Sequence, residues 1–258
     1  MKTQGHHIQS RTDRQAQPQQ AETAGKAVLS AMDASVGYQG KALFSPATFE
    51  IYAGECILLC GANGSGKSTL LKAIAGIRSL LQGHISISKT PPMIPSGIPK
   101  TEGFTLRSFI RTGCYSISDW AGRLSPEAEE AVDEAMESLG ISHLADRDIS
   151  GLSDGEFQKG CIASALARRS PLVLLDEPTA FLDAENKISV LATIRDTAIR
   201  TGTAFLFSSH DIRDAAPLCS RVFAIGADGV FRSGGPSAEE KNKTIHTIFR
   251  NKSIIFED

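Results

Sequence analysis

The chain has 258 residues, of which 41% are hydrophobic and 22% are charged, the composition of a folded globular protein rather than of a disordered or fibrous one. Its formal net charge of −2 gives no basic excess, so we expect no nucleic acid partner. Its longest apolar runs fall far short of the roughly 18–20 residues that cross a bilayer, so we expect no membrane span.

The first residues and the cysteines bear on the compartment. Residues 1–26 are rich in Gln, Ser and Thr and have no apolar stretch that resembles a secretory signal, so they are predicted to form a flexible polar tail. The five cysteines form no CxxC pair and no cluster at zinc-site spacing, so we expect buried, reduced thiols. An odd number of cysteines without a signal sequence is typical of a reducing cytoplasm.

Short aliphatic runs that alternate with longer helical patterns predict an α/β fold. The predicted strands are Glu55 to Cys60, Leu172 to Leu175, Ala204 to Ser208 and Val222 to Ile225. Because these runs are apolar without alternation, they read as strands buried on both faces, as in a parallel sheet.

A different region separates the first of these strands from the second. It opens with the Pro- and Gly-rich stretch from Pro91 to Gly103, which interrupts regular structure. Farther on, Ser125 and Pro126 are a suitable cap and first turn, apolar residues follow at helical spacing up to Leu139, and Gly140 is a stop signal. The pattern therefore predicts an amphipathic helix over 126–139.

The segment 61–69 is the most specific motif of the chain. It reads Gly-Ala-Asn-Gly-Ser-Gly-Lys-Ser-Thr and fits the phosphate-loop pattern, with a predicted strand before it and a helical pattern after it. Glycines let consecutive backbone N–H groups face phosphates at a helix N-terminus. The residues expected to bind nucleotide are Gly61, Ala62, Asn63, Gly64, Ser65, Gly66, Lys67, Ser68 and Thr69.

Within this motif, individual side chains have distinct expected roles. Lys67 is expected to reach the β- and γ-phosphates and to act in catalysis, and Thr69 to support the α-phosphate. Ser68 supplies a hydroxyl for Mg²⁺, the ion that bridges the β- and γ-phosphate oxygens. The expected cofactors are therefore ATP and Mg²⁺.

Two adjacent carboxylates end the second predicted strand, at the sheet edge where α/β proteins bind ligands. Asp176 is expected to hold Mg²⁺, directly or through water, and Glu177 to act as general base on the attacking water. His210 follows the third predicted strand and is expected beside the same edge, close enough to sense a γ-phosphate and to take part in catalysis.

A helix start precedes the two acids. Ser153 reads as an N-cap and Glu156, three residues later, as its capping-box partner, with the helix running to about Arg168. Many helices start this way, so these residues alone indicate structure and not function.

Taken in order, the segments resemble those of the ATP-binding cassette ATPases over roughly 29–234. The matching segments are the phosphate loop, Leu-Ser-Asp-Gly-Glu-Phe-Gln-Lys at 152–159, Leu-Leu-Asp-Glu-Pro-Thr at 174–179, Phe-Leu-Asp at 181–183, and His210. The second segment is similar to the LSGGQ helix start, which most other phosphate-loop ATPases lack.

The resemblance implies a fold and a division of the chain. It implies a phosphate-loop NTPase core of mainly parallel sheet, with an antiparallel β part and a small helical subdomain. We therefore expect one ATPase domain over 27–258, with the helical subdomain inserted at about 97–165 and the predicted helix 126–139 facing a permease.

The resemblance also implies how ATP is held. Two subunits would pair head to tail, with each ATP between one phosphate loop and the other subunit's Ser153, Gly155 and Glu156 at the helix N-terminus. Tyr38 matches the aromatic residue on which these proteins stack adenine, although a half-buried strand tyrosine remains the alternative. Asp183 matches the residue that communicates between the two ATP sites, so we expect it to couple them.

Some segments look like those of importers of iron complexes, haem or cobalamin. These segments are Leu-Ser-Asp-Gly at 152–155, Glu-Pro-Thr-Ala-Phe-Leu-Asp at 177–183, Gly-Cys-Tyr at 113–115 and Asp-Trp-Ala-Gly-Arg-Leu at 119–124. The resemblance implies three partners: a second ATPase subunit, a polytopic membrane permease and, through the permease, a substrate-binding protein. It places the chain on the cytoplasmic face of a bacterial inner membrane, as a peripheral subunit.

Two positions depart from the family pattern. The family has a glutamine where the core joins the helical subdomain, and this chain has none between Gln82 and Gln158, so Ser96 is expected in that coupling position. Glu156 replaces the usual glutamine of the helix start and adds negative charge near a phosphate, which its capping role would offset.

The expected function is ATP hydrolysis that drives import through a separate permease. One alternative is a non-transport ATP-binding cassette switch protein that acts on nucleic acid or ribosomes. The lack of a basic patch in the sequence argues against it. Another is a regulatory module that binds ATP and scarcely hydrolyses it, which the missing glutamine motivates and which Glu177 and His210 oppose.

Overall fold

The computed structural model describes residues 27–115 and 123–248. The tail predicted for 1–26 and residues 119–122 of the importer-like segment lie outside the described residues. The strands are β1 (Ala27–Ser35), β2 (Gly37–Tyr38), β3 (Lys41–Ala42), β4 (Ala47–Tyr52), β5 (Cys56–Gly61), β6 (Gln82–Ile87), β7 (Met93–Ile94), β8 (Leu172–Asp176), β9 (Ala204–Ser208), β10 (Arg221–Ile225) and β11 (Phe231–Gly234). The α-helices are α1 (Lys67–Ile74), α2 (Leu106–Thr112), α3 (Pro126–Ser138), α4 (Asp154–Leu166), α5 (Ala184–Thr201), α6 (Ile212–Ala215) and α7 (Ala238–His246). Short 3-10 turns are η2 (Ser142–Leu144), η3 (Ile149–Gly151) and η4 (Ala216–Leu218).

A six-stranded central sheet has the order β11-β10-β5-β9-β8-β7, and a three-stranded sheet has the order β4-β1-β6. The central sheet is parallel except for β11, which runs antiparallel to β10, and the second sheet is antiparallel throughout. The α/β class, the mainly parallel sheet and the antiparallel part are confirmed. The strand predicted at Ala204 to Ser208 has the expected bounds. The strands β8 and β10 differ from the prediction by one residue at one end, and β5 by one residue at each end.

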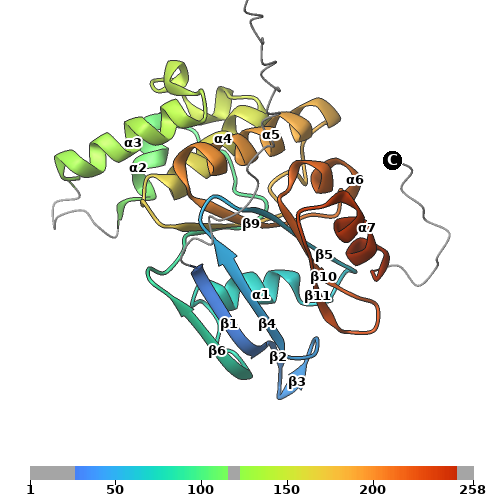
Figure 1. Ribbon diagram of the computed structural model, residues 1–258. Coiled ribbons are helices and arrows are strands. Elements are labelled where there is room, and N and C mark those ends of the chain that lie inside the picture. Colours follow the sequence, from blue (N-terminus) through green and yellow to red (C-terminus); the bar gives the residue numbers. More distant parts are fainter. Residues whose placement is uncertain (1–26, 116–122, 249–258) are drawn as a thin grey trace, which may run out of the picture.

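Alternate residues of the central strands enter two different cores, because successive side chains of a strand point to opposite faces. In β5, Leu58 and Cys60 pack with the helices α2 to α5, whereas Ile57 and Leu59 pack with α1 and the antiparallel sheet. Figure 1 shows these layers, with α1 between the two sheets and α2 to α5 above. The strands are therefore buried on both faces, as their unbroken apolar runs predicted.

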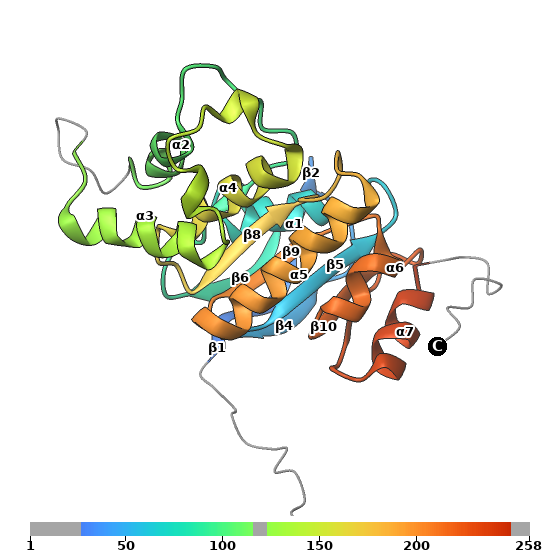
Figure 2. The same cartoon turned by 90° about the horizontal axis from the view of Figure 1, so that it is seen from above.

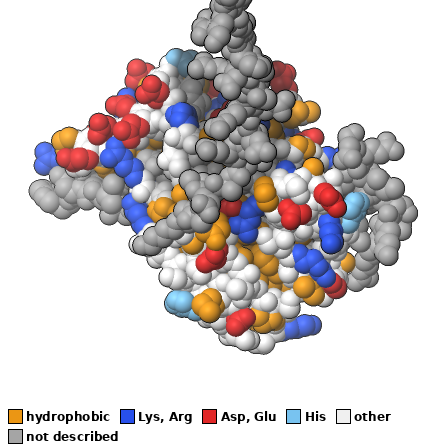
Figure 3. Space-filling view, in the orientation of Figure 1, with side chains coloured by type: hydrophobic (Ala, Val, Ile, Leu, Met, Phe, Trp, Pro, Cys, Tyr) orange, Lys and Arg blue, Asp and Glu red, His pale blue; other side chains and the backbone are white. Residues whose placement is uncertain are grey.

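The helix predicted over 126–139 is α3, which ends one residue earlier. Ser125 accepts a hydrogen bond from the Ala128 backbone N–H, and Gly140 after the helix has φ 68°, a conformation that favours glycine. Ion pairs join α3 to its neighbours: Arg111 of α2 lies 2.7 Å from Glu129, and Arg169, after α4, lies 2.8 Å from Glu134. Figure 3 shows acidic and basic side chains intermingled over the helical part of the molecule.

Seen from above, α2, α3 and α4 form a group of helices at one side of the central sheet (Figure 2). None of the helices in residues 27–115 and 123–248 combines the length and the apolar character needed to span a bilayer. The group spans Leu106 to Leu166 and so falls, except for the last residue of α4, in the range 97–165 predicted for a helical subdomain.

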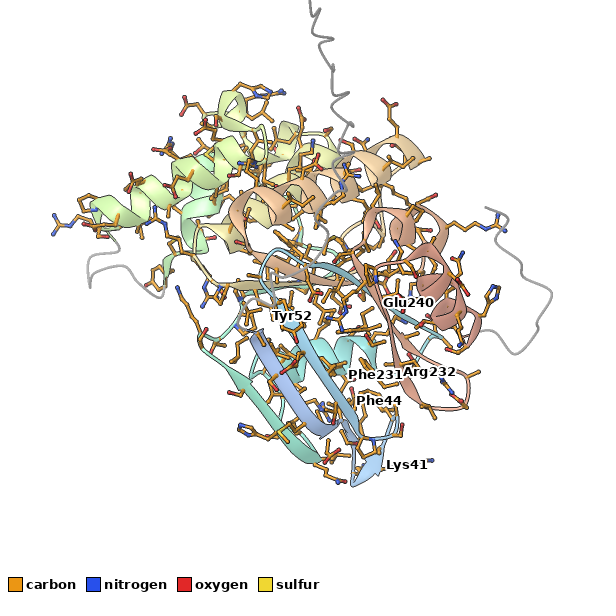
Figure 4. The ribbon with its side chains drawn as sticks, viewed as in Figure 1. Lys41, Phe44, Tyr52, Phe231, Arg232 and Glu240 are labelled. Carbon is orange, nitrogen blue, oxygen red and sulfur yellow. The ribbon has the colours of Figure 1, made fainter. Side chains whose placement is uncertain are left out.

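An aromatic cluster joins the two sheets near the phosphate loop. The ring of Phe231 lies 6.2 Å from that of Phe44, 5.0 Å from Phe49 and 5.2 Å from Phe223, between ring centroids. Figure 4 shows Phe44 and Phe231 next to each other. Because the Phe44 ring also lies against Gly66, the cluster supports the phosphate loop from behind.

Candidate active site

The phosphate loop connects β5 to α1 and leaves the N-terminus of α1 open. Gly66 is the N-cap, with φ 106°, and no side chain accepts a hydrogen bond from the first turn. That turn has no acidic residue, so the positive end of the helix dipole is not neutralised by a carboxylate. The hydroxyl of Ser65 is buried without a hydrogen-bond partner. An anion with several oxygens, such as a phosphate chain, fits these donors.

Lys67 lies inside this loop. Its ammonium donates to the backbone carbonyls of Gly61 at 3.0 Å and Ala62 at 3.2 Å, and the side chain is buried. Burial lowers the pKa of Lys67, while the nearby negative charge of Glu177 acts in the opposite direction. A buried cation held only by neutral carbonyls is able to bind a phosphate strongly.

Asp176, at the end of β8, lies directly opposite the phosphate loop. One carboxylate oxygen accepts from the Ser68 hydroxyl at 2.9 Å and from the Ser208 hydroxyl at 2.7 Å. Hydroxyl and carboxylate oxygens are suitable protein ligands for Mg²⁺. Its other ligands are usually waters and phosphate oxygens. Ser68 and Asp176 therefore have the chemistry to hold Mg²⁺ beside a bound nucleotide.

Glu177 and His210 are in contact. The Nε2 atom of His210 lies 2.6 Å from Oε1 of Glu177, and both side chains are partly exposed to solvent. Glu177 has φ 51°, which is uncommon for a residue with a side chain, and its backbone N–H donates to the Ser208 hydroxyl at 2.9 Å. Ser208 thus contacts both the carboxylate of Asp176 and the backbone of Glu177.

Most of these groups line one cavity of about 300 Å³, although Asp176 is not part of its lining. Its lining residues are Tyr38, Leu43, Asn63, Gly64, Gly66, Lys67, Ser68, Thr69, Glu177 and His210. The structure therefore brings the phosphate loop, one acid and the histidine to the same cavity, as the sequence predicted for neighbouring strand ends.

Tyr38 lies at the rim of this cavity and is about half exposed. Its hydroxyl lies 3.4 Å from that of Thr69, and the guanidinium carbon of Arg78 lies 3.9 Å from its ring centroid. The contact with Thr69 and the charge of Arg78 both lower the pKa of Tyr38. One ring face is therefore covered by a cation, which leaves the other for a ligand.

The predicted capping box at the start of α4 is confirmed. The Glu156 N–H donates to the Ser153 hydroxyl at 3.2 Å, and the Ser153 N–H donates to the Glu156 carboxylate at 2.8 Å. Hydrogen bonding to the Ser153 backbone, and to a smaller extent to the Ser153 side chain, lowers the pKa of Glu156. Ser153, Gly155 and Glu156 do not line the cavity that holds the phosphate loop, so one subunit alone does not bring the two helix starts together.

Gly155 and Asp183 are connected through Asn186. Asp183 caps α5, accepting from the Asn186 backbone at 2.8 Å and from its side-chain amide at 3.0 Å. A Cβ on Gly155 would lie 2.5 Å from the Asn186 side-chain oxygen. Gly155 therefore permits the start of α4 to pack against a side chain that Asp183 holds in place.

Ser96 follows β7, in the exposed segment that leaves the central sheet. Because Ile94 of β7 pairs with Leu175 of β8, this segment starts beside the strand that carries Asp176. Ser96 does not line the phosphate-loop cavity.

Sequence reasoning missed Ser208, Arg78 and Lys100. For Ser208 a signal exists, because a hydroxyl that ends a strand next to β8 lies within reach of the acids at the end of β8. Arg78 and Lys100 reach their partners across loops, and no local pattern marks either residue.

Comparisons with known proteins agree with this geometry. A family model described as ABC transporter matches residues 44–180. The hemin import ATP-binding protein HmuV of Streptomyces coelicolor is 34% identical over 83% of this chain and 80% of its own length. The ferric enterobactin transport ATP-binding protein FepC of Escherichia coli strain K12 is 27% identical over 87% of this chain and 88% of its own length.

A solved structure shares the fold. The ADP conformation of MJ1267, an ATP-binding cassette of an ABC transporter, matches with a TM-score of 0.72 and 20% identity, over 86% of this chain and 98% of that chain. At this identity the likeness establishes the fold.

Proposed function

This chain belongs to the ABC transporter family, as an ATP-binding subunit with ATPase activity, and we propose that it drives uptake of an iron complex, haem or cobalamin. The names of its relatives support this cargo class, since they are hemin and ferric enterobactin transport proteins. The cargo would pass through a polytopic permease fed by a substrate-binding protein. The subunit would work at the cytoplasmic face of a bacterial inner membrane.

The domain organisation follows from the same proposal. It divides the chain into one ATPase domain over 27–258, with the helical subdomain at about 97–165. The position of α2, α3 and α4 together at one side of the central sheet supports this division.

The observation that carries the proposal is the contact of Glu177 with His210 in the phosphate-loop cavity. Glu177 takes a proton from the attacking water, and His210 keeps its carboxylate turned toward the phosphate end of the cavity. Lys67 holds the β- and γ-phosphates, and the open N-terminus of α1 supplies backbone donors. Tyr38 stacks on adenine with its uncovered face.

Ser68 and Asp176 would hold Mg²⁺, which supplies positive charge that offsets the charge of the transferred phosphoryl group. Their shared hydrogen bond supports this assignment, because it places a hydroxyl and a carboxylate oxygen together beside the phosphate loop.

A second copy of the chain completes each site. Its Ser153, Gly155 and Glu156 would cover the γ-phosphate, and Asp183 would couple the two sites through Asn186 and the start of α4. Their absence from the cavity lining of one chain supports a site shared between two subunits. Ser96 would occupy the coupling position in the segment after β7.

The test is ATP hydrolysis by the purified chain, alone and with its permease in lipid. We expect Glu177→Gln to lower turnover by roughly 100-fold or more while ATP binding persists. Lys67→Ala is expected to lose ATP binding itself. Turnover that the permease stimulates and that needs Glu177 supports a transport ATPase.

The opposite outcome has a clear meaning. If the wild-type chain binds ATP and never turns it over, even with the permease, the mechanism is wrong. A nucleotide-binding regulatory module, which the missing coupling glutamine favours, then replaces it.

A further inference from the structure

Lys100 lies against the N-terminus of α4. Its ammonium lies 2.6 Å from the Leu152 carbonyl oxygen and 2.7 Å from Oδ1 of Asp154, and 5.8 Å from the ring centroid of Phe157. The lysine side chain is only 24% exposed, whereas that of Asp154 is 64% exposed. The cation is therefore held in one place at the start of the helix.

The segment that carries Lys100 is fixed to the same region by other bonds. The Gly103 N–H donates to the Asp148 carboxylate at 2.8 Å, and the Ile149 N–H donates to the Phe104 carbonyl at 2.9 Å. Lys100 thus belongs to a loop that lies along the chain leading into α4, and its position does not depend on one flexible side chain alone.

The first turn of α4 carries negative charge, which is unfavourable for a helix start that is proposed to face a phosphate. It contains two acids, Asp154 and Glu156, whereas the first turn of α1 contains none. The Glu156 carboxylate accepts from the Ser153 backbone, which ties its charge to the helix itself. Asp154 projects its carboxylate toward solvent at the first helical position and meets Lys100 there.

We propose that Lys100 is a positioning residue that neutralises Asp154, so that the start of α4 accepts the terminal phosphate of an ATP bound to a second copy of this chain. The inference rests on the proposed function, since it concerns the site shared by two subunits. A carboxylate left unpaired beside an incoming phosphate would repel it, and Lys100 offsets that repulsion while adding a cation to the positive end of the helix.

The experiment measures ATP-driven pairing of the full chain in a Glu177→Gln background, by sedimentation over a series of ATP concentrations. We expect Lys100→Met to raise the ATP concentration needed for half-maximal pairing by about tenfold, because an unpaired Asp154 carboxylate would then repel the incoming phosphate. ATP binding to the unpaired subunit, followed with a fluorescent ATP analogue, is expected to stay unchanged.

The second variant makes the proposal specific. Asp154→Gly removes the acid, so the double variant Lys100→Met/Asp154→Gly is expected to pair within about twofold of the parent, since the repulsive charge is gone. Lys100→Arg keeps the cation and is also expected to pair like the parent.

A matched control is Lys89→Met. Lys89 also donates to two backbone carbonyls, those of Arg168 at 2.5 Å and Arg169 at 3.2 Å, but its partners lie at the far end of α4. This variant is expected to pair like the parent, and thermal unfolding of all variants checks that they fold.

Three results would overturn the inference. The first is that Lys100→Met pairs at the same ATP concentration as its parent. The second is that the double variant pairs no better than Lys100→Met. Either result would leave Lys100 with a structural role only. If the parent binds ATP and never pairs, the shared site of the proposed function fails, and this inference fails with it.

Discussion

Two helices of this molecule begin in opposite ways, although both are proposed to face a phosphate. α1 begins at Gly66 with no side-chain cap and no acid in its first turn. α4 begins with a complete capping box, formed by Ser153 and Glu156, and has two acids in its first turn. The backbone donors of α1 are therefore available in the isolated chain, whereas those of α4 are partly occupied by its own side chains.

The difference indicates an order of binding. The open start of α1 can take ATP in a single subunit, because no side chain has to be displaced. At α4 a phosphate competes with a cap worth about 0.5–2 kcal/mol and meets acidic side chains. We therefore expect α4 to engage only an ATP that is already held by another subunit, and the following predictions test this contrast.

Gly66→Ala should have the largest effect. The φ of 106° does not suit a side chain, and a new Cβ would lie 3.1 Å from Cβ of Leu43. We expect a loss of about 3 kcal/mol in the free energy of unfolding, and weaker ATP binding. The control is Gly76→Ala, also at positive φ but with its nearest atom at 4.0 Å, which should cost less and leave ATP affinity unchanged.

Gly155→Ala should have the next largest effect. Its Cβ would overlap the Asn186 side chain, at a cost of about 2 kcal/mol in unfolding free energy. ATPase activity with the permease should fall, while ATP binding to the isolated subunit stays intact. Gly151→Ala, four residues earlier in the same region and with open space around it, is the control and should be neutral. If Gly155→Ala weakened ATP binding to the isolated subunit as much as it lowered ATPase activity, the two helix starts would not act separately.

Ser153→Ala should cost about 1 kcal/mol in unfolding free energy, because the Glu156 N–H loses its acceptor. Chemical denaturation measures this cost, with Ser125→Ala at the start of α3 as a cap without proposed contact to nucleotide. Both variants should lose similar stability, and only Ser153→Ala should lower turnover. Equal turnover in the two variants would argue against a role for Ser153 at the phosphate.

The pH dependence of Glu156 should be the smallest effect. Its pKa is lower in the folded chain than the usual value near 4.3, so its contribution is present above that value and is lost as pH falls through the folded pKa. Since the group is partly exposed, we expect no more than about 0.5 kcal/mol. The free energy of unfolding of the wild type should fall more steeply below about pH 4 than that of Glu156→Gln. Parallel curves would mean that the capping box carries no charge-dependent stability.

Local patterns were enough to predict much of the fold and of the site. The spacing of Ser153 and Glu156 gave the capping box, because both partners lie within one helical turn. Ser125 and Gly140 marked the ends of α3 for the same reason. The positions of the phosphate loop and of the acids at the end of β8 follow from strand ends that a parallel sheet brings to one edge.

Contacts across loops could not be predicted in this way. Lys100 meets Asp154, and Arg78 covers the ring of Tyr38, although no periodic pattern relates the members of either pair. Such contacts depend on where the loops cross in space, which side-chain spacing along the chain does not encode. The proposed roles of Ser96 and Asp183 still depend on resemblance to the family.

The order of strands in the central sheet has a consequence for synthesis. β5 carries the phosphate loop, yet its two neighbours in the sheet, β9 and β10, begin only at Ala204 and Arg221. The ribosome therefore completes β5 long before the strands that hold it have been made, and parallel pairing over such a separation forms slowly. We therefore expect the apolar β5 to stay without its neighbouring strands until the last fifth of the protein is made.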